Sequence, residues 1–255
     1  MRPSNRKPIV AVDNVIIEFK RVSLAIDGAR KVLDDISFQI RRGEMLVLLG
    51  RSGSGKTTIL KLINGLLKPT AGEVFFDGKS TSSRDPIRLR RQIGYVIQEA
   101  GLFPHYTVGR NVGLVPSLEG WPEDRIAARV HEMLSLVGLD AGIFLKRFPR
   151  ELSGGQRQRV GVARALAADP PVLLLDEPFG ALDPITRTEI RREFRELQRR
   201  VQKTMVFVTH DVREAFQLAT EIALVKDGKL IAIVEPSAFV KLDHPEARAF
   251  VESLQ

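Results

Sequence analysis

The chain has 255 residues, contains no cysteine and carries a formal net charge of +8, from 39 Lys and Arg against 31 Asp and Glu. Its hydrophobic fraction of 44% and charged fraction of 27% exclude wholesale disorder, because such a composition can bury a core. The lack of cysteine excludes a disulfide scaffold, a zinc site made of thiolates and a cysteine nucleophile.

At the N-terminal end we expect no targeting segment. Residues 1–8 are basic and no apolar region follows them, so we expect no signal peptide. Apolar runs elsewhere are short, and none approaches the roughly 20 residues that span a bilayer. The positive net charge is compatible with nucleic acid, an anionic membrane face or nucleotide phosphates as a partner.

A glycine-rich loop follows a short apolar run at residues 46–49, which is typical of a buried strand. Residues 50–57 read Gly-Arg-Ser-Gly-Ser-Gly-Lys-Thr and match the phosphate-loop pattern G-x-x-x-x-G-K-[ST] at each fixed position. A helical pattern over residues 57–63 supplies the context that this motif requires. The alternative interpretation is an ordinary Gly/Ser turn.

The residue types of this loop suit nucleotide phosphates. Glycines let backbone N–H groups approach phosphate oxygens closely, and the N-terminus of the following helix favours an anion. We expect Lys56 to neutralise the β- and γ-phosphates and the Thr57 hydroxyl to bind Mg²⁺. The predicted phosphate-binding residues are Gly50, Arg51, Ser52, Gly53, Ser54, Gly55, Lys56, Thr57 and Thr58.

Helical patterns dominate from about residue 99 to residue 159, including one over residues 124–137. We interpret this segment as a helical subdomain inserted into an α/β core made of residues 1–98 and 160–235. The last residues, 236–255, are expected to form a short tail with a helical end. The whole chain would then form a single domain.

The sequence Leu-Ser-Gly-Gly-Gln at residues 152–156 opens a further helical pattern. Ser153 and Gln156 have the spacing of a capping box. Gly154 and Gly155 between them weaken a helix start by roughly 1 kcal/mol each, which favours a role in which N–H groups approach an anion closely. The alternative is a helix start that is only well capped.

Asp176 and Glu177 follow a second continuously apolar run at residues 172–175. A carboxylate at the tip of a buried strand suits Mg²⁺, and Glu177 is placed to orient or deprotonate an attacking water. The alternative is a surface Asp-Glu pair that starts a loop. The phosphate loop upstream favours the catalytic interpretation.

The C-terminal part continues the alternation of helix and strand. An amphipathic helix is expected near residues 185–201, and strands at residues 204–209 and 222–225. Asp227-Gly228 indicates a hairpin turn. The alternation predicts an α/β fold with a mostly parallel sheet.

In their order and spacing these motifs resemble those of the ATP-binding subunits of ABC transporters, from about residue 15 to about residue 251. The resemblance implies a P-loop NTPase (RecA-like) core with a mostly parallel sheet, an antiparallel β subdomain and an inserted helical subdomain. It also implies ATP hydrolysis with ATP and Mg²⁺. The matching motifs are the Walker A loop 50–57, the Q-loop Gln98, the signature 152–156, the Walker B run ending at Asp176-Glu177, the D-loop 181–183 and the switch His210.

The resemblance also implies a role for each matching residue. Gln98 would contact Mg²⁺ or the lytic water, and His210 would contact the γ-phosphate and hold Glu177. The chain would act as a head-to-tail dimer with Asp183 at the seam. The implied catalytic residues are Glu177, His210 and Gln98, the metal-binding residues are Thr57, Gln98 and Asp176, and the residues that cover the opposite subunit's ATP are Ser153, Gly154, Gly155 and Gln156.

One position departs from the family pattern. Ile26 stands where members usually carry an aromatic residue that stacks on adenine. An aliphatic side chain covers the base by contact without stacking. We therefore count Ile26 among the ATP-binding residues and expect weaker contact with the base.

A finer resemblance lies outside these motifs, in residues 85–98, 101–108, 112–122 and 179–187. These stretches resemble importers of quaternary amines such as glycine betaine, choline, carnitine and proline betaine. They imply a transmembrane permease that contacts residues 98–107, an extracytoplasmic solute-binding protein, and a peripheral location on the cytoplasmic face of the cell (inner) membrane. No nucleic acid partner is expected.

Several alternatives stay open. The solute could be another small molecule, such as methionine or a sulfur-containing betaine, and a non-transport ABC ATPase acting on nucleic acid is a further possibility. Many close relatives carry a pair of CBS modules, and we expect none within residues 236–255. Arg84, Arg88, Arg90 and Arg91 could be a solvated face, and His105 and Trp121 could be packing residues.

Overall fold

The computed structural model describes residues 14–26, 30–98 and 100–254. The basic N-terminal residues 1–8, Glu99 at the start of the predicted helical subdomain, and Gln255 lie outside the described residues. Among the helices that are described, none combines the length and apolar character needed to cross a membrane.

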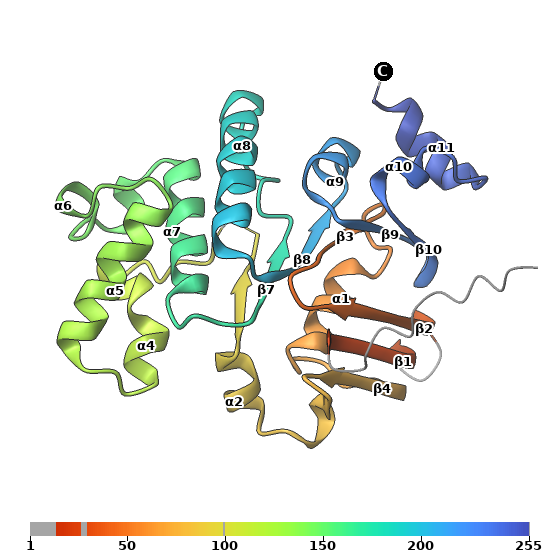
Figure 1. The fold of residues 1–255 in the computed structure, drawn as a ribbon, viewed down its shortest axis with the longest axis horizontal. Coiled ribbons are helices and arrows are strands. Elements are labelled where there is room, and N and C mark those ends of the chain that lie inside the picture. The colour runs from red at the N-terminus through yellow and green to blue at the C-terminus, as the bar shows by residue number, and fades with distance from the viewer. Residues whose placement is uncertain (1–13, 27–29, 99, 255) are drawn as a thin grey trace, which may run out of the picture.

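The larger sheet has the strand order β10-β9-β3-β8-β7-β6 (Figure 1). Its neighbouring strands pair in parallel, except that β10 is antiparallel to β9. This arrangement confirms the predicted mostly parallel sheet. The strands are β3 (Met45–Leu49), β6 (Ile93–Val96), β7 (Val172–Asp176), β8 (Thr204–Thr209), β9 (Glu221–Lys226) and β10 (Lys229–Val234).

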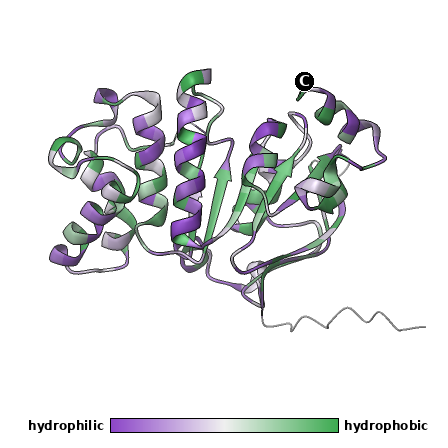
Figure 2. Cartoon of the chain, turned by 45° about the horizontal axis from the view of Figure 1, so that its top comes forward, coloured by the Kyte–Doolittle hydropathy of each residue, from purple (hydrophilic) through white to green (hydrophobic). Residues whose placement is uncertain are grey.

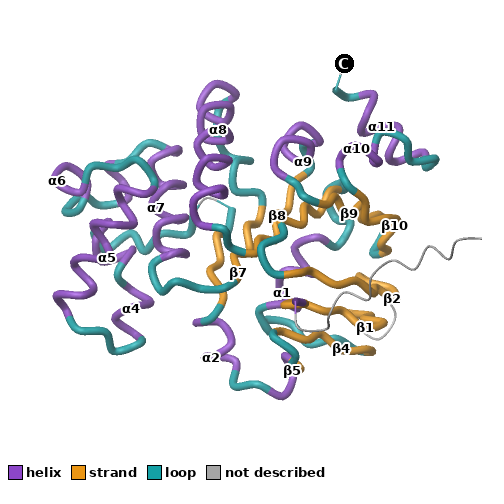
Figure 3. Tube along the Cα trace, in the orientation of Figure 1, coloured by secondary structure: helices purple, strands orange, loops and turns teal. Residues whose placement is uncertain are grey.

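A smaller sheet is fully antiparallel, with the order β2-β1-β4-β5. It lies beside the larger sheet, with α1 (Lys56–Ile63) between the two (Figure 3). The strands are β1 (Val15–Ile26), β2 (Arg30–Arg41), β4 (Ala71–Phe76) and β5 (Lys79–Ser80). The predicted fold class, a mostly parallel sheet with an antiparallel β subdomain and a helical region, is therefore confirmed.

The larger sheet is buried on both faces, because alternate residues of its strands enter two separate cores. Leu46 and Leu48 of β3 pack with α1 and the antiparallel sheet. Met45, Val47 and Leu49 pack with the helices on the other face. Continuous apolar runs are thus explained by burial on both sides.

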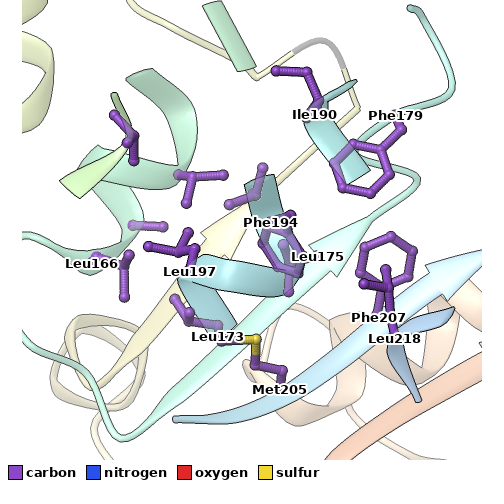
Figure 4. Close-up of a cluster of buried hydrophobic side chains, with 14 of the residues drawn as sticks. Leu166, Leu173, Leu175, Phe179, Ile190, Phe194, Leu197, Met205, Phe207 and Leu218 are labelled. Carbon is purple, nitrogen blue, oxygen red and sulfur yellow. The ribbon is translucent and has the colours of Figure 1, made fainter. Parts of the chain in front are cut away.

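The second core lies beneath α8 (Pro184–Val201). Phe179, Phe194 and Phe207 form a cluster in which ring centroids are 5.4 to 6.0 Å apart, and Leu173 and Met205 lie beside it (Figure 4). Figure 2 shows hydrophobic strands behind this helix, whose outer side is largely hydrophilic. The apolar stripe predicted for residues 185–201 is the face of α8 that meets the sheet.

The helices of residues 114–166 gather at one end of the molecule, away from the antiparallel sheet, whereas those of residues 212–252 lie near β9 and β10 (Figure 1). Between α4 (Leu114–Leu118) and α5 (Glu123–Leu136), Trp121 stacks beneath Arg125, whose guanidinium carbon is 3.7 Å from the ring centroid. The helical elements besides α1 and α8 are α2 (Pro86–Arg91), α3 (Val108–Val112), α4 (Leu114–Leu118), α5 (Glu123–Leu136), α6 (Ala141–Phe144), α7 (Gly154–Leu166), α9 (Val212–Leu218), α10 (Pro236–Phe239), α11 (Pro245–Glu252), and the 3₁₀ turns η2 (Thr81–Ser83) and η3 (Pro149–Glu151).

The predicted hairpin turn joins β9 to β10. Asp227 and Gly228 both have positive φ, at 48° and 74°, as a two-residue turn of this kind requires. The backbone N–H of Gly228 donates to the carbonyl oxygen of Ser54, 3.1 Å away. This turn therefore touches the glycine-rich loop.

Candidate functional site

The glycine-rich loop connects β3 to α1 at the carboxyl end of a central strand. Gly55 is the N-cap of α1 and has a φ of +106°, a backbone conformation that residues with a side chain rarely adopt. A Cβ at Gly55 would lie 2.7 Å from the side chain of Leu33 on β2. Both the backbone conformation and the close approach of β2 therefore require glycine at this position.

Lys56 is folded back onto the loop. Its ammonium donates to the carbonyl oxygens of Gly50 and Arg51, each 2.8 Å away, and the residue is buried. Burial lowers the pKa of Lys56, and the nearby charges of Glu177 and Asp176 oppose this shift. The loop therefore holds a cation beside a turn of backbone amides, an arrangement that suits a phosphate chain.

Asp176 brings Thr57 and Tyr95 together. The Thr57 hydroxyl donates to Asp176 Oδ1 at 2.9 Å, and the Tyr95 hydroxyl donates to Asp176 Oδ2 at 3.4 Å. Burial raises the pKa of Asp176, although both hydroxyl donors act against this, and burial also raises the pKa of Tyr95.

Carboxylate and hydroxyl oxygens are the donors that Mg²⁺ prefers, so Thr57 and Asp176 fit the predicted metal. Among the described residues no cluster of three or more acidic or histidine side chains could hold a metal ion alone. A cation held by Thr57 and Asp176 would therefore need further oxygens from nucleotide phosphates or water.

Sequence reasoning missed Tyr95. It lies on β6, three residues before Gln98, and β6 pairs with β7, which ends at Asp176. If β6 and β7 had been recognised as neighbouring strands, the phenol of Tyr95 would have been placed beside the carboxylate of Asp176.

The predicted catalytic residues gather around Gly180. Glu177 Oε2 is 3.2 Å from His210 Nδ1, which makes the two side chains hydrogen-bonded partners. Glu177 Oε2 lies 3.6 Å, and Gln98 Nε2 lies 3.8 Å, from the point that a Cβ on Gly180 would occupy. The structure thus brings Gln98, Glu177 and His210 together.

The backbone conformation and a backbone hydrogen bond fix the position of Glu177. It has a positive φ of 44°, and its N–H donates to the carbonyl oxygen of Val208 on β8 at 3.1 Å. Because β7 and β8 pair Asp176 with Val208, the two strands end side by side. Their register places His210, just past β8, next to Glu177.

A buried glutamate that the sequence did not reveal supports the start of α9. The Thr209 hydroxyl donates to Glu214 Oε2 at 2.6 Å, and the Asp211 N–H donates to the Thr209 hydroxyl oxygen at 2.9 Å. Burial raises the pKa of Glu214. This network flanks His210 on both sides in the sequence.

Replacing Glu214 with glutamine should stabilise the protein at neutral and higher pH. The folded-state pKa of Glu214 is raised, so the wild type loses stability as pH rises through the window between the ordinary and the raised pKa. The variant should therefore unfold at a higher temperature at pH 8, by about 2–4 °C for each kcal/mol gained, and the difference should vanish at acid pH. Thermal unfolding across pH, with the exposed Glu189→Gln as control, checks this; equal shifts at all pH values would contradict it.

The signature residues form the predicted capping box. The Gln156 N–H donates to Ser153 Oγ at 3.2 Å, and the Ser153 N–H donates to Gln156 Oε1 at 2.9 Å. A Cβ on Gly155 would lie 3.0 Å from Thr186 of α8, so glycine lets the two helix starts approach. Gly154 is the first residue of α7.

Asp183 caps α8 beside these residues. Its Oδ1 accepts from the N–H groups of Ile185 and Thr186, and these bonds, led by those with Thr186, lower the pKa of Asp183. Within the described part of the chain, no hydrogen bond or ion pair links the signature residues 153–156 to the phosphate loop. The predicted site residues therefore form two groups. The first is the phosphate loop with Asp176, Glu177, Gln98 and His210, and the second is the signature residues 153–156 with Asp183.

Ile26 is the last residue of β1 and is 51% exposed. It pairs with Arg30 of β2, two residues before the part of β2 that approaches Gly55. Asp27 and Gly28, which end the segment aligned with the adenine position, lie outside the described residues. Ile26 thus presents an exposed apolar side chain at the end of β1.

Comparisons with known proteins place the chain among characterised relatives. The family model of ABC transporters matches residues 33–180. The chain is 48% identical to the glycine betaine/carnitine/choline transport ATP-binding protein OpuCA of Bacillus subtilis, over 93% of this chain and 61% of that protein. It is 47% identical to the choline transport ATP-binding protein OpuBA of Bacillus subtilis, over 89% and 59% of the two chains.

A third relative is the glycine betaine uptake system ATP-binding protein YehX of Escherichia coli, at 47% identity over 85% of this chain and 70% of that protein. The chain spans about three fifths of the length of OpuCA and OpuBA.

A solved structure of the ATP-binding cassette MJ0796, a dimer in a post-hydrolysis state bound to ADP and Pi, has a TM-score of 0.77. It is 35% identical, and the alignment covers 87% of this chain and 99% of that one. On this evidence the chain belongs to the ABC transporter family, as an ATP-binding domain.

Proposed function

We propose that the chain binds and hydrolyses ATP as a subunit of an ABC importer for a quaternary amine osmoprotectant such as glycine betaine, choline or carnitine. The observation that carries the enzymatic part is the grouping of Lys56, Asp176 and Glu177 at the carboxyl ends of β3 and β7, the two strands that flank β8 in the larger sheet. The solute class is supported by the names of the relatives that share nearly half of the sequence.

ATP binding begins at the phosphate loop. The ammonium of Lys56 leaves the carbonyl oxygens of Gly50 and Arg51 and pairs with the β- and γ-phosphates, while loop amides donate to phosphate oxygens. Thr57 and Asp176 would hold Mg²⁺, which when bound neutralises charge on the transferring phosphoryl group. Tyr95 orients Asp176 through its hydrogen bond to Oδ2.

Glu177 is the general base for hydrolysis. Its carboxylate accepts a proton from water as the water oxygen bonds to the γ-phosphorus and the bond from that phosphorus to the leaving ADP oxygen breaks. His210 holds Glu177 through the contact at 3.2 Å and contacts the γ-phosphate. Gln98, whose side-chain amide lies near Gly180 as the Glu177 carboxylate does, would orient the water and contact the metal.

The second group of residues works across a dimer. Ser153, Gly154, Gly155 and Gln156 cover the γ-phosphate bound by the other subunit, and Asp183 lies at the seam. The separation of this group from the phosphate loop of its own chain supports the assignment, as does the 75% exposure of Ile185 next to Asp183. A large apolar side chain with that exposure is suited to burial in an interface.

The helical segment couples the cassette to a permease. We assign residues 99–159 to a helical subdomain, residues 1–98 and 160–235 to the nucleotide-binding core, and residues 236–255 to a tail. A groove of about 310 Å³ opens beside the Q-loop, lined in part by Ile97, Phe103 and Arg164. Exposed apolar side chains there suit a helix of a membrane subunit, which would place the chain on the cytoplasmic face as a peripheral subunit.

Reconstitution tests this function. The chain and its co-purifying permease in proteoliposomes should hydrolyse ATP faster when a solute-binding protein loaded with glycine betaine or choline is added. Stimulation by methionine or a sulfur-containing betaine alone would assign a different solute. Recovery of nucleic acid with no membrane protein would overturn the transport function.

Replacing Ile26 with tyrosine should tighten ATP binding about three- to tenfold, because an aromatic ring adds stacking on adenine. The gain should be seen with ATP and be much smaller with inorganic triphosphate, which has no base. Titration calorimetry with both ligands measures it. Unchanged affinity for ATP would show that Ile26 does not face the base.

A further inference from the structure

The C-terminal helix α11 reaches the phosphate loop through one carboxylate. Glu246 Oε1 accepts from Arg51 Nε, and Glu246 Oε2 lies 3.5 Å from Lys226 Nζ at the end of β9. One side chain therefore connects the phosphate loop, the central sheet and α11. These residues, with Ser52 and Ser54, line a polar cavity of about 340 Å³ beside the loop.

Glu246 is one of three buried acidic residues in the described part of the chain, with Asp176 and Glu214, and its side chain is only 7% exposed. The hydrogen bond from Arg51 foremost, together with the charges of Arg51 and Lys226, lowers the pKa of Glu246. A buried carboxylate that keeps two cationic partners is ionised at neutral pH. Losing either partner would leave a poorly solvated charge, so the contact holds its members in place.

The contact with Arg51 bears directly on Lys56. The carbonyl oxygen of Arg51 accepts from Lys56 Nζ at 2.8 Å and from the Ser54 N–H at 3.2 Å. Ser54 in turn accepts from Gly228, in the turn next to Lys226. Glu246 therefore fixes the residue whose carbonyl oxygen holds the ammonium of Lys56.

We propose that Glu246 is a positioning residue for nucleotide binding, which acts through Arg51 to keep the phosphate loop in its binding conformation before ATP arrives. A loop that is already ordered loses less conformational entropy on binding, so this contact raises affinity for the phosphate chain without touching it. The inference rests on the proposed function, because it concerns the same nucleotide site.

The test compares four proteins with the wild type by titration with a fluorescent ATP analogue and by steady-state hydrolysis. The variants are Glu246→Gln, Arg51→Gln, the double variant, and Asp243→Asn as control. Asp243, which lies just before α11, pairs with Arg248 of that helix, so its loss reports the effect of disturbing α11 alone. Arg51 is 71% exposed, so Arg51→Gln folds even if Glu246→Gln does not.

We expect Glu246→Gln to raise the Kd for nucleotide about three- to tenfold while kcat at saturation stays near that of the wild type. Asp243→Asn should leave the Kd unchanged. The double variant should bind no more weakly than Arg51→Gln alone, because Glu246 acts only through that residue. In the nucleotide-free protein, amides of residues 50–57 should exchange faster in Arg51→Gln than in the wild type.

Four results would overturn the inference. Additive effects in the double variant would show that Glu246 does not act through Arg51. Tighter binding by Glu246→Gln would show that the carboxylate merely repels phosphate. An unchanged Kd with a lowered melting temperature would show that Glu246 has a structural role only. A wild type that binds no nucleotide would overturn the proposed function together with this inference.

Discussion

Replacing Glu177 with glutamine should lower kcat for ATP hydrolysis about 10²- to 10⁴-fold and leave nucleotide binding near that of the wild type. The amide has the size of the carboxyl group and keeps a contact with His210, but it cannot accept the proton of the attacking water. The variant should therefore hold ATP and accumulate as the closed dimer. Phosphate release, nucleotide titration and light scattering in ATP measure the three quantities.

The exposed Glu189→Gln is the matched control for this variant and should hydrolyse ATP at the rate of the wild type. Hydrolysis by Glu177→Gln at that same rate would show that another group accepts the proton. A monomeric variant in saturating ATP would instead contradict the assignment of Ser153 and Asp183 to the partner's site, while leaving the role of Glu177 intact.

Replacing Lys56 with alanine should raise the Kd for ATP at least about tenfold, because a charge-assisted contact with two phosphates is lost in a partly buried site. The effect should be much smaller for adenosine, which has no phosphates. Titration with both ligands separates the two contributions. Lys68→Ala removes an exposed lysine beyond α1 and should change neither value.

Binding of ATP by Lys56→Ala with the affinity of the wild type would contradict the assignment of the phosphate loop. Loss of affinity for ATP and adenosine alike would indicate a general disturbance of the fold, since Lys56 also holds the carbonyl oxygens of Gly50 and Arg51. The ratio of the two affinities therefore distinguishes a phosphate contact from a structural one.

Features that depend on neighbouring residues could be predicted from the sequence. The buried strands β3 and β7, the capping box of Ser153 and Gln156, and the turn at Asp227 each follow from a local pattern of polarity or backbone preference. The grouping of Gln98, Glu177 and His210 was expected from the resemblance to ABC transporters. The spacing of these residues alone did not reveal it.

Contacts between residues far apart in the chain could not be predicted. Tyr95 is 81 residues from Asp176, and Arg51 is 195 residues from Glu246. Such pairs depend on which strands become neighbours and on where a terminal helix packs, and no local periodicity encodes either. The sequence allowed Arg84 and Arg90 to be part of a solvated face. In the structure both donate hydrogen bonds to backbone carbonyl oxygens, which the sequence pattern does not indicate.

The single tryptophan gives the helical segment an intrinsic fluorescence probe. Trp121 lies in the helical segment beneath Arg125, and the chain holds no other indole and no thiol. Its emission therefore reports the surroundings of that segment alone, without any label. A cysteine introduced at one chosen position of the core would carry a dye without background labelling, so energy transfer from Trp121 could follow how the segment moves as nucleotide binds.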